Sequence, residues 1–547
     1  MRNNLPYCLL CFSIILTVAA CKKEGDNGKT VFRYNESAGI TSLDPAFARN
    51  QANIWAVNQL FNGLVQLNDK LEAEACIAQS WEVRDNGLTY VFHLRKDVFF
   101  HDDPCFKDGR GRRVIADDFV YSFLRIIDPS IASPGAWVFS NADTNFPGGC
   151  FQAPDDSTLL IRMKEAFPPF IGILSMQYCS VIPHEAVARY REDFRKHPVG
   201  TGPFRFQYWK EGVKLIMLRN DHYFETDGTN NLPYLDAVAI SFIVDKQSVF
   251  LEFIKGNLDF LSGIDASYKD ELLTRQGSLN PAYAGKVVLQ TQAYLNTEYL
   301  GFNLSEKSGM QDNPLLKKEI RLAVNHGFDR SKMMRYLRNN IGMPGIYGFI
   351  PPGLPSFDSS ATYGYDYDPA RARDLLAAAG YPQGAGLPPV TLSTNASYLD
   401  LATYIQQQLN ELGFKILLDV HPPASMREMI AQGKLDFFRG SWIADYPDAE
   451  NFLSLFVSHN HTPYGPNYTR YTNREFDRMY QEARLETDVS KRNTLYRKMD
   501  SLMMTDVPVV VLYYDQVLRF TGMQITNLGS NPMNLLSLKR VKKKKPA

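Results

Sequence analysis

The stretch FFRGSWIADYPDAENF, residues 437–452, changes its character halfway along. Together with Leu435, its first two residues are typical of a buried strand. Arg439, Trp442 and Asp445 then follow in close succession. Aromatic rings beside an unneutralised carboxylate suit neither a core nor an ordinary surface. The stretch therefore predicts a loop held for a ligand, with an ordinary strand-to-helix connection as the alternative.

Strands and helices alternate on the N-terminal side of this stretch. A helix over 368–380 is predicted by Asp368 at the N-cap, Pro369 at the first helical position and Gly380 just past the end. The elements that follow are a strand at 390–393, a helix at 401–412, a strand at 414–420 and a helix at 425–433. This order predicts an α/β lobe, with 437–452 at the end of a strand, where open α/β sheets bind ligands.

Elements of the same kinds are predicted elsewhere. They are a strand at 87–94, a helix at 116–125, strands at 204–208 and 214–219, and a helix at 313–325. A chain of 547 residues is too long for one ordinary core, so two or three lobes are expected. Lys+Arg and Asp+Glu balance at 59 each, which argues against a nucleic-acid partner. The lysine run 542–545 is expected to be a solvated tail.

The N-terminus is typical of an exported protein. Arg2 precedes an apolar run over 5–20, which is short for a membrane-spanning helix and predicts a signal peptide over 1–20. The run ends in Val-Ala-Ala before Cys21 and so resembles a bacterial lipobox, which implies lipidation of Cys21 and a tether over 21–29. The alternative is a plain secretory signal. We expect a membrane-anchored protein that faces the periplasm or the cell surface.

Four later cysteines lie within one segment of the chain: Cys76, Cys105, Cys150 and Cys179. Their spacing lacks the C-x-x-C pattern of a zinc site, so we expect no metal. In an oxidising compartment they can form two disulfides in any of three pairings, and the alternative is four buried free thiols. Their clustering suggests a small separate lobe.

Motifs of the common enzyme classes are missing from the sequence. It has no G-x-S-x-G, P-loop or G-x-G-x-x-G. His101, Asp102 and Cys105 could be metal ligands, but a turn with solvated acids is the preferred interpretation. We therefore expect neither an enzyme nor a cofactor.

Short motifs along nearly the whole chain carry a family resemblance. They are SLDP (42–45), LFNGLV (60–65), AQSWEV (78–83), DNGLTYVFHLR (85–95), FHD (100–102), ADDFVYS (116–122), PVGTGPF (198–204), RLAVN (321–325) and WIADYPD (442–448). In this order they resemble the family 5 extracellular solute-binding proteins, the dipeptide- and oligopeptide-binding components of ABC transporters.

The resemblance implies a periplasmic-binding-protein-like α/β fold (type II, cluster C), with two lobes, a hinge and a small inserted domain. Lobe I would take residues 30–60, 185–290 and 505–547, the inserted domain 61–184, and lobe II 291–504. It also implies a monomer that binds peptides by hinge closure and delivers them to the permease subunits of an ABC transporter. The lipid on Cys21 would be the only membrane contact.

Roles for individual residues follow from the same resemblance. Asp445 occupies the position that binds the ligand's amine, and a buried carboxylate would gain from a ligand ammonium. Ser441, Trp442 and Ile443 would bind the ligand's main chain and wall a pocket. Arg439 would bind the ligand's carboxylate, or else would pair with a neighbouring acid.

Other interpretations of the stretch and the chain stay open at this point. Asp448 is typical of a helix N-cap. Rival functions are the same fold binding a nickel chelate, haem or an oligosaccharide, or a surface lipoprotein of another class.

Overall fold

The computed structural model describes residues 28–265, 267–305, 312–361 and 363–544. The predicted signal peptide, the lipidation site Cys21 and residues 22–27 of the tether lie outside the described residues. None of the described helices combines the length and apolarity that a membrane span requires.

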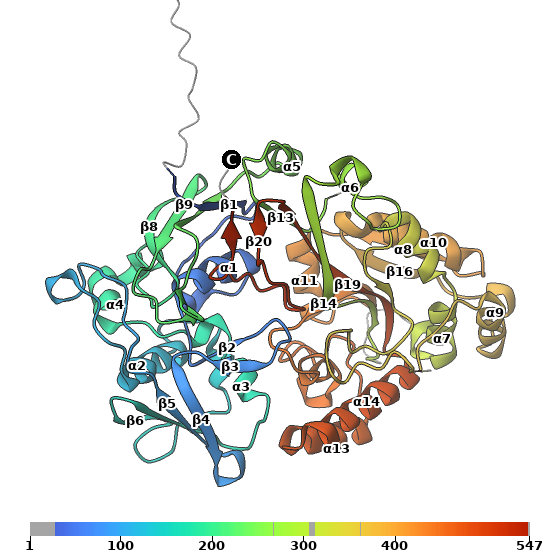
Figure 1. The fold of residues 1–547 in the computed structure, drawn as a ribbon. Helices are drawn as coiled ribbons and strands as arrows, with labels where there is room; N and C mark the ends of the chain where they lie inside the picture. Colours follow the sequence, from blue (N-terminus) through green and yellow to red (C-terminus); the bar gives the residue numbers. More distant parts are fainter. Residues whose placement is uncertain (1–27, 266, 306–311, 362, 545–547) are drawn as a thin grey trace, which may run out of the picture.

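One open, mixed sheet runs through the middle of the molecule (Figure 1). In order across the sheet, its strands are β17 (Ile416–Val420), β16 (Val390–Thr394), β18 (Phe437–Ile443), β14 (Val287–Phe302), β19 (Val509–Gly522), β13 (Phe260–Ser262), β1 (Val31–Asn35), β12 (Ala237–Ser241), β9 (Lys214–Arg219) and β8 (Phe204–Lys210). A short strand, β15 (Met343–Pro344), also pairs with β19.

The two long strands β14 and β19 connect the lobes. Val287–Ala293 pairs with the end of β19 beside β13, whereas Thr297–Gly301 pairs with the beginning of β19 beside β18. The register shifts between Ala293 and Thr297. Of the predicted boundaries, 290/291 falls within β14 and 504/505 falls within α14 (Val489–Asp506). The first half of β19 thus pairs with strands of lobe II, although the sequence assigned the whole strand to lobe I.

In lobe II, helices cover both faces of the sheet. α7 (Lys318–His326), α8 (Arg330–Leu337), α9 (Pro369–Ala378) and α10 (Leu399–Asn410) contribute to a core with Phe437. α11 (Pro423–Ala431), α13 (Arg474–Leu485) and α14 contribute to a core with Phe438. Successive strand residues point to opposite faces of the sheet, so Phe437 packs against the helices on one face and Phe438 against those on the other. The helix predicted at 368–380 is confirmed as α9, with the Asp368 side chain accepting the Arg371 N–H.

The inserted segment has a sheet of its own, at the lower left of Figure 1. Its order is β4 (Ala78–Arg84), β5 (Thr89–Leu94), β7 (Thr158–Arg162) and β6 (Phe151–Asp155), and α2 (Ala116–Ile127) packs on it. The apolar interior is nevertheless continuous with lobe I, because Phe92 and Phe119 belong to one cluster with Phe32 and Phe204.

The described residues also form further strands and helices. They are β2 (Val65–Leu67), β3 (Ala73–Ala75), β10 (Thr226–Asp227), β11 (Asn230–Asn231), β20 (Ile525–Thr526) and β21 (Lys542–Lys543), with α1 (Gln51–Leu60), α3 (Phe170–Ile173), α4 (His184–Tyr190), α5 (Lys246–Ile254), α6 (Lys269–Leu272) and α12 (Glu450–Leu453).

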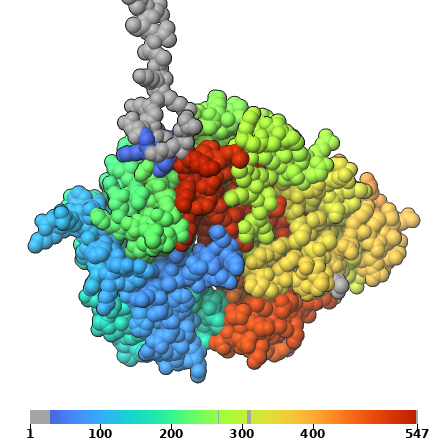
Figure 2. All heavy atoms as spheres, in the orientation of Figure 1, coloured from blue at the N-terminus to red at the C-terminus, as the bar shows by residue number. Residues whose placement is uncertain are grey.

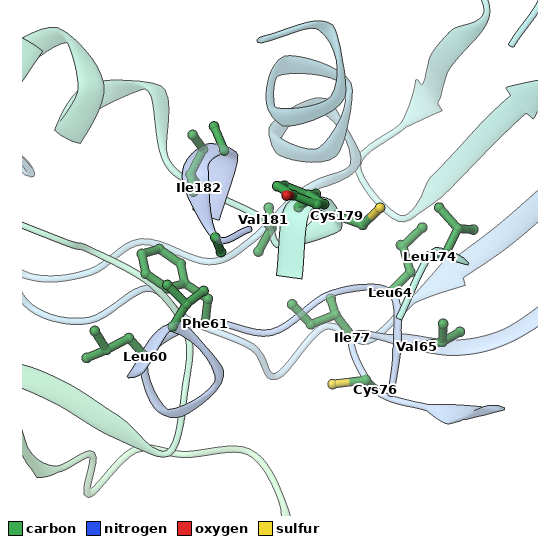
Figure 3. Packing of buried hydrophobic residues seen from close by; sticks show 14 of the residues in the cluster. Leu60, Phe61, Leu64, Val65, Cys76, Ile77, Leu174, Cys179, Val181 and Ile182 are labelled. Carbon is green, nitrogen blue, oxygen red and sulfur yellow. The ribbon is translucent and has the colours of Figure 1, made fainter. Parts of the chain in front are cut away.

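All four described cysteines are free thiols, so the structure has the alternative to the predicted disulfides. Cys76 and Cys179 lie in separate places among buried apolar side chains such as Leu64 and Ile77 (Figure 3). Burial raises the pKa of Cys76 to about 12, which keeps its thiol protonated. Cys150 is also buried, and Cys105 is half-buried.

The expectation of a solvated lysine tail is wrong for its first residues. Lys542 and Lys543 form β21, which pairs with β20. The Lys543 ammonium lies 2.8 Å from the buried carboxylate of Asp259 and donates to the Val31 carbonyl. An internal acid therefore holds the end of the chain on lobe I.

Replacement of Gly348 by alanine should destabilise lobe II. Asp500 on α14 accepts the N–H groups of Phe349 and Ile350, and a Cβ on Gly348 would meet its Oδ2 at 1.9 Å. We expect Gly348→Ala to lower the free energy of unfolding by about 1–3 kcal/mol, measured by thermal melting. Gly172→Ala is the control, since its Cβ would meet only Pro447 at 3.7 Å. Equal melting temperatures for the two variants would contradict this account.

Candidate functional site

The second half of β18 has one edge without a strand partner among the described residues. β14 pairs with β18 along its whole length, whereas β16 pairs only with Phe437 and Phe438. The backbone of Arg439–Ile443 therefore has a side on which an extended chain can add. Trp442 is half-buried and Ile443 is exposed along this edge.

Asn451 on α12 orders the loop that follows β18. Its side-chain oxygen accepts the indole N–H of Trp442 at 2.9 Å and the backbone N–H of Asp445 at 3.2 Å. Its amide also hydrogen-bonds the Asp445 carboxylate. Asn451 is itself buried, so one fixed side chain holds both the ring and the acid.

Asp445 keeps an exposed side chain, and no cation among the described residues forms an ion pair with it. Desolvation by the surrounding protein raises the pKa of its carboxyl, and the hydrogen bond from Asn451 lowers it. A carboxylate that is open to solvent on one side and crowded by protein on the other is poised to accept a cation from outside.

The loop around Asp445 faces the inserted domain. Burial raises the pKa of Tyr178 to about 12, and the negative charge of Asp445 adds to the shift. The rings of Trp137 and Tyr446 lie 6.1 Å apart. Nearby, Arg484 of lobe II forms a 2.8 Å ion pair with Glu165 and lies over the ring of Phe167. The two parts of the molecule are therefore in contact along this rim.

A polar pocket opens between lobe I and the inserted domain. Its volume is about 380 Å³, and its lining includes Asn62, Asp69 and Lys539. Figure 2 shows the surface hollowed where the blue residues near 70 meet the red C-terminal segment. The lining segment Ser175–Gln177 leads directly into Tyr178, which places the pocket next to the Asp445 loop.

Arg439 is paired with an internal acid. Its guanidinium forms an ion pair with Glu298 of β14 and lies 3.4 Å from the centre of the Tyr398 ring. The side chains of Arg439 and Glu298 are 13% and 4% exposed. Of the two alternatives for Arg439, the structure shows the arginine paired with a neighbouring acid. Sequence analysis missed Glu298, although it is a lone acid in a mostly apolar strand.

Asp448 caps its helix one residue away from the expected place. Its carboxylate accepts the Glu450 N–H at 2.9 Å, while Ala449 takes the N-cap position of α12. Glu450 is buried and accepts the hydroxyls of Tyr446 and Tyr480, and burial raises the pKa of both acids. These two carboxylates belong to the support of the loop.

A family model for bacterial extracellular solute-binding proteins, family 5, matches residues 72–464. The chain belongs to this family. Its mixed α/β fold and open sheets agree with that assignment, and the family is one of binding proteins rather than of catalysts.

Known relatives of this family 5 protein match over most of their length. It is 28% identical to the haem-binding protein A of Haemophilus influenzae, over 90% of this chain and 91% of that one. It is 25% identical to the dipeptide-binding protein DppE of Bacillus subtilis, over 94% and 92%. The structure of DppA from Helicobacter pylori with peptide STSA has a TM-score of 0.76 and 24% identity, over 94% of this chain and 99% of that one. The structure of HbpA2 from Haemophilus parasuis has a TM-score of 0.78 and 22% identity, and the match covers 94% of this chain and 99% of that one.

Replacement of Asn451 should loosen the loop without unfolding the protein. Asn451→Ala leaves the indole N–H of Trp442 and the Asp445 N–H without their acceptor, which costs about 1–3 kcal/mol. We expect amide hydrogen exchange of residues 443–446 to become about tenfold faster. Asn460→Ala is the matched control, because its amide donates to Ser454 and not to this loop. Unchanged exchange in Asn451→Ala would contradict the assigned role.

Proposed function

We propose that this protein binds peptides between its lobes and delivers them to an ABC permease for import. The observation that carries the proposal is Asp445, a partly desolvated carboxylate without a described cationic partner beside an open strand edge. A peptide supplies both missing partners, an ammonium for the acid and a main chain for the edge.

The ligand's amine would bind at Asp445, where its positive charge would compensate for the desolvation of the carboxylate. Ser441, Trp442 and Ile443 would offer main-chain groups to the peptide, and the Trp442 ring would wall one side chain pocket. Relatives named as dipeptide- and di/tripeptide-binding proteins support this class of ligand. The polar pocket between lobe I and the inserted domain would leave room for solvated side chains of varied sequence.

We assign the contact that the inserted domain already makes with lobe II, through Arg484 and Glu165 at the rim, to the closed state of the protein. The lobes would turn about the register shift in β14, between Ala293 and Thr297. The proposed protein is a monomer that is exported to the periplasm or the cell surface and anchored there by a lipid on Cys21. Its domain limits are those predicted from the sequence.

A direct test is mass spectrometry of the ligand that copurifies with the protein. We expect a mixture of short peptides, because recognition of the amine and main chain does not depend on sequence. Haem, a nickel chelate, a sugar or an empty protein would count against the proposal. Haem is included because one relative is named as a haem-binding protein.

Neutralisation of Asp445 should abolish most of the affinity for peptides. Truncating one partner of a desolvated charge pair costs about 2–5 kcal/mol, so Asp445→Asn should weaken binding about thirtyfold or more. Isothermal titration calorimetry with alanine peptides of two to five residues measures this loss. Asp374→Asn, an exposed acid on α9, is the control and should bind normally.

The same titrations should show a pH dependence that belongs to Asp445. The ligand ammonium requires the ionised carboxylate, whose pKa is raised by desolvation. Affinity of the native protein should therefore fall as the pH drops through that raised value, while Asp445→Asn should lack this dependence. Parallel pH profiles for the two proteins would exclude Asp445 as the partner of the amine.

A further inference from the structure

Three neighbouring strands, β18, β14 and β19, carry a row of polar side chains next to the open edge of β18. We call this row, with the charged groups that contact it, the polar wall. Glu298 of β14 lies directly opposite Ser441 of β18 on one side and Tyr513 of β19 on the other. Such cross-strand neighbours share one face of a sheet and contact each other. The Ser441 hydroxyl donates to Glu298 at 2.6 Å.

Two arginines on this wall are each paired with an internal acid. Arg439 pairs with Glu298, and Arg338, at the end of α8, pairs with Asp515 of β19 at 2.8 Å. Each guanidinium also lies over a tyrosine ring, Arg439 over Tyr398 and Arg338 over Tyr513. Each of these two arginines is therefore neutralised by its own acid, Arg439 by Glu298 and Arg338 by Asp515.

Glu298 is difficult to displace from Arg439. Its side chain is 4% exposed, so a ligand carboxylate that took over the guanidinium would leave a buried acid without its counter-ion. An uncompensated buried charge is strongly destabilising, so displacement of Glu298 would oppose the binding of a ligand carboxylate. The Nε of Arg439 is also buried without a hydrogen-bond partner in the described part of the chain, so it is closed to a ligand.

The loop at the C-terminal end of β18 contains an acid without such a counter-ion. Asp445 is exposed, and the residues described here provide it with no ion pair. The site thus offers an unpaired anion where β18 ends and a neutralised cation within β18.

We propose that Glu298 takes the place of a ligand carboxylate at Arg439, so that this protein selects amine-bearing peptides without requiring a free C-terminal carboxylate. This inference rests on the proposed peptide-binding function. It makes Glu298 a specificity-determining residue, which acts by occupying the guanidinium.

The test compares each alanine peptide of two to five residues as the free acid and as the C-terminal amide, by calorimetry with the mature protein. We expect the two forms to bind the native protein with affinities within about threefold. Glu298→Gln removes the internal charge and should create a preference for the free acid of about tenfold or more. Asp259→Asn, which neutralises a buried acid paired with Lys543 in lobe I, is the control and should create no preference.

The outcomes separate this inference from the proposed function. A tenfold preference of the native protein for free acids would overturn the role of Glu298 while leaving peptide binding intact. A folded Glu298→Gln variant without the new preference would overturn it as well. Should that variant fail to fold, the ratio measured on the native protein decides alone. Absence of binding to every peptide would overturn the proposed function, and this inference with it.

Discussion

The antiparallel pairing of β14 with β19 is the constraint on which the rest of the structure depends. Each strand contributes one half to lobe I and the other half to lobe II, so the lobes share backbone hydrogen bonds through a single ribbon. Backbone groups in a sheet must stay paired, so the ribbon resists sliding. In the proposed closure it would bend where its register shifts, between Ala293 and Thr297. The proposed hinge and the proposed binding edge therefore belong to the same sheet.

The binding edge exists because two neighbours of β18 have different lengths. β14 continues beside it to Ile443, whereas β16 ends at Thr394 and turns into α10. The unpaired backbone then leads into a loop in which Asn451 accepts the Asp445 N–H and the buried acid Glu450 accepts the Tyr446 hydroxyl. A rigid support of this kind lowers the entropy cost of binding a flexible ligand.

Much of the fold could be predicted from local patterns. The helix caps, the alternating strands and the Gly-rich turns around 368–433 predicted α9, β16, α10, β17 and α11 within a few residues. The lysine tail was predicted wrongly, because what decides its place is distant in the sequence. Lys543 binds Asp259, which lies 284 positions away, and no local pattern reports such a partner.

Local sequence could nominate a site residue, but it could not say which charges the fold would pair. Asp445 stood out because a carboxylate beside aromatic rings suits neither a core nor an ordinary surface. Arg439 was ambiguous, since its charge is meaningful only with respect to Glu298 on another strand. A buried arginine with an internal acid contributes shape and hydrogen bonds but little net field, whereas an unpaired acid attracts any cation that can reach it. In the proposed binding mode, this difference between two residues of similar sequence context and opposite electrostatic state would make the site favour the amine end of a ligand.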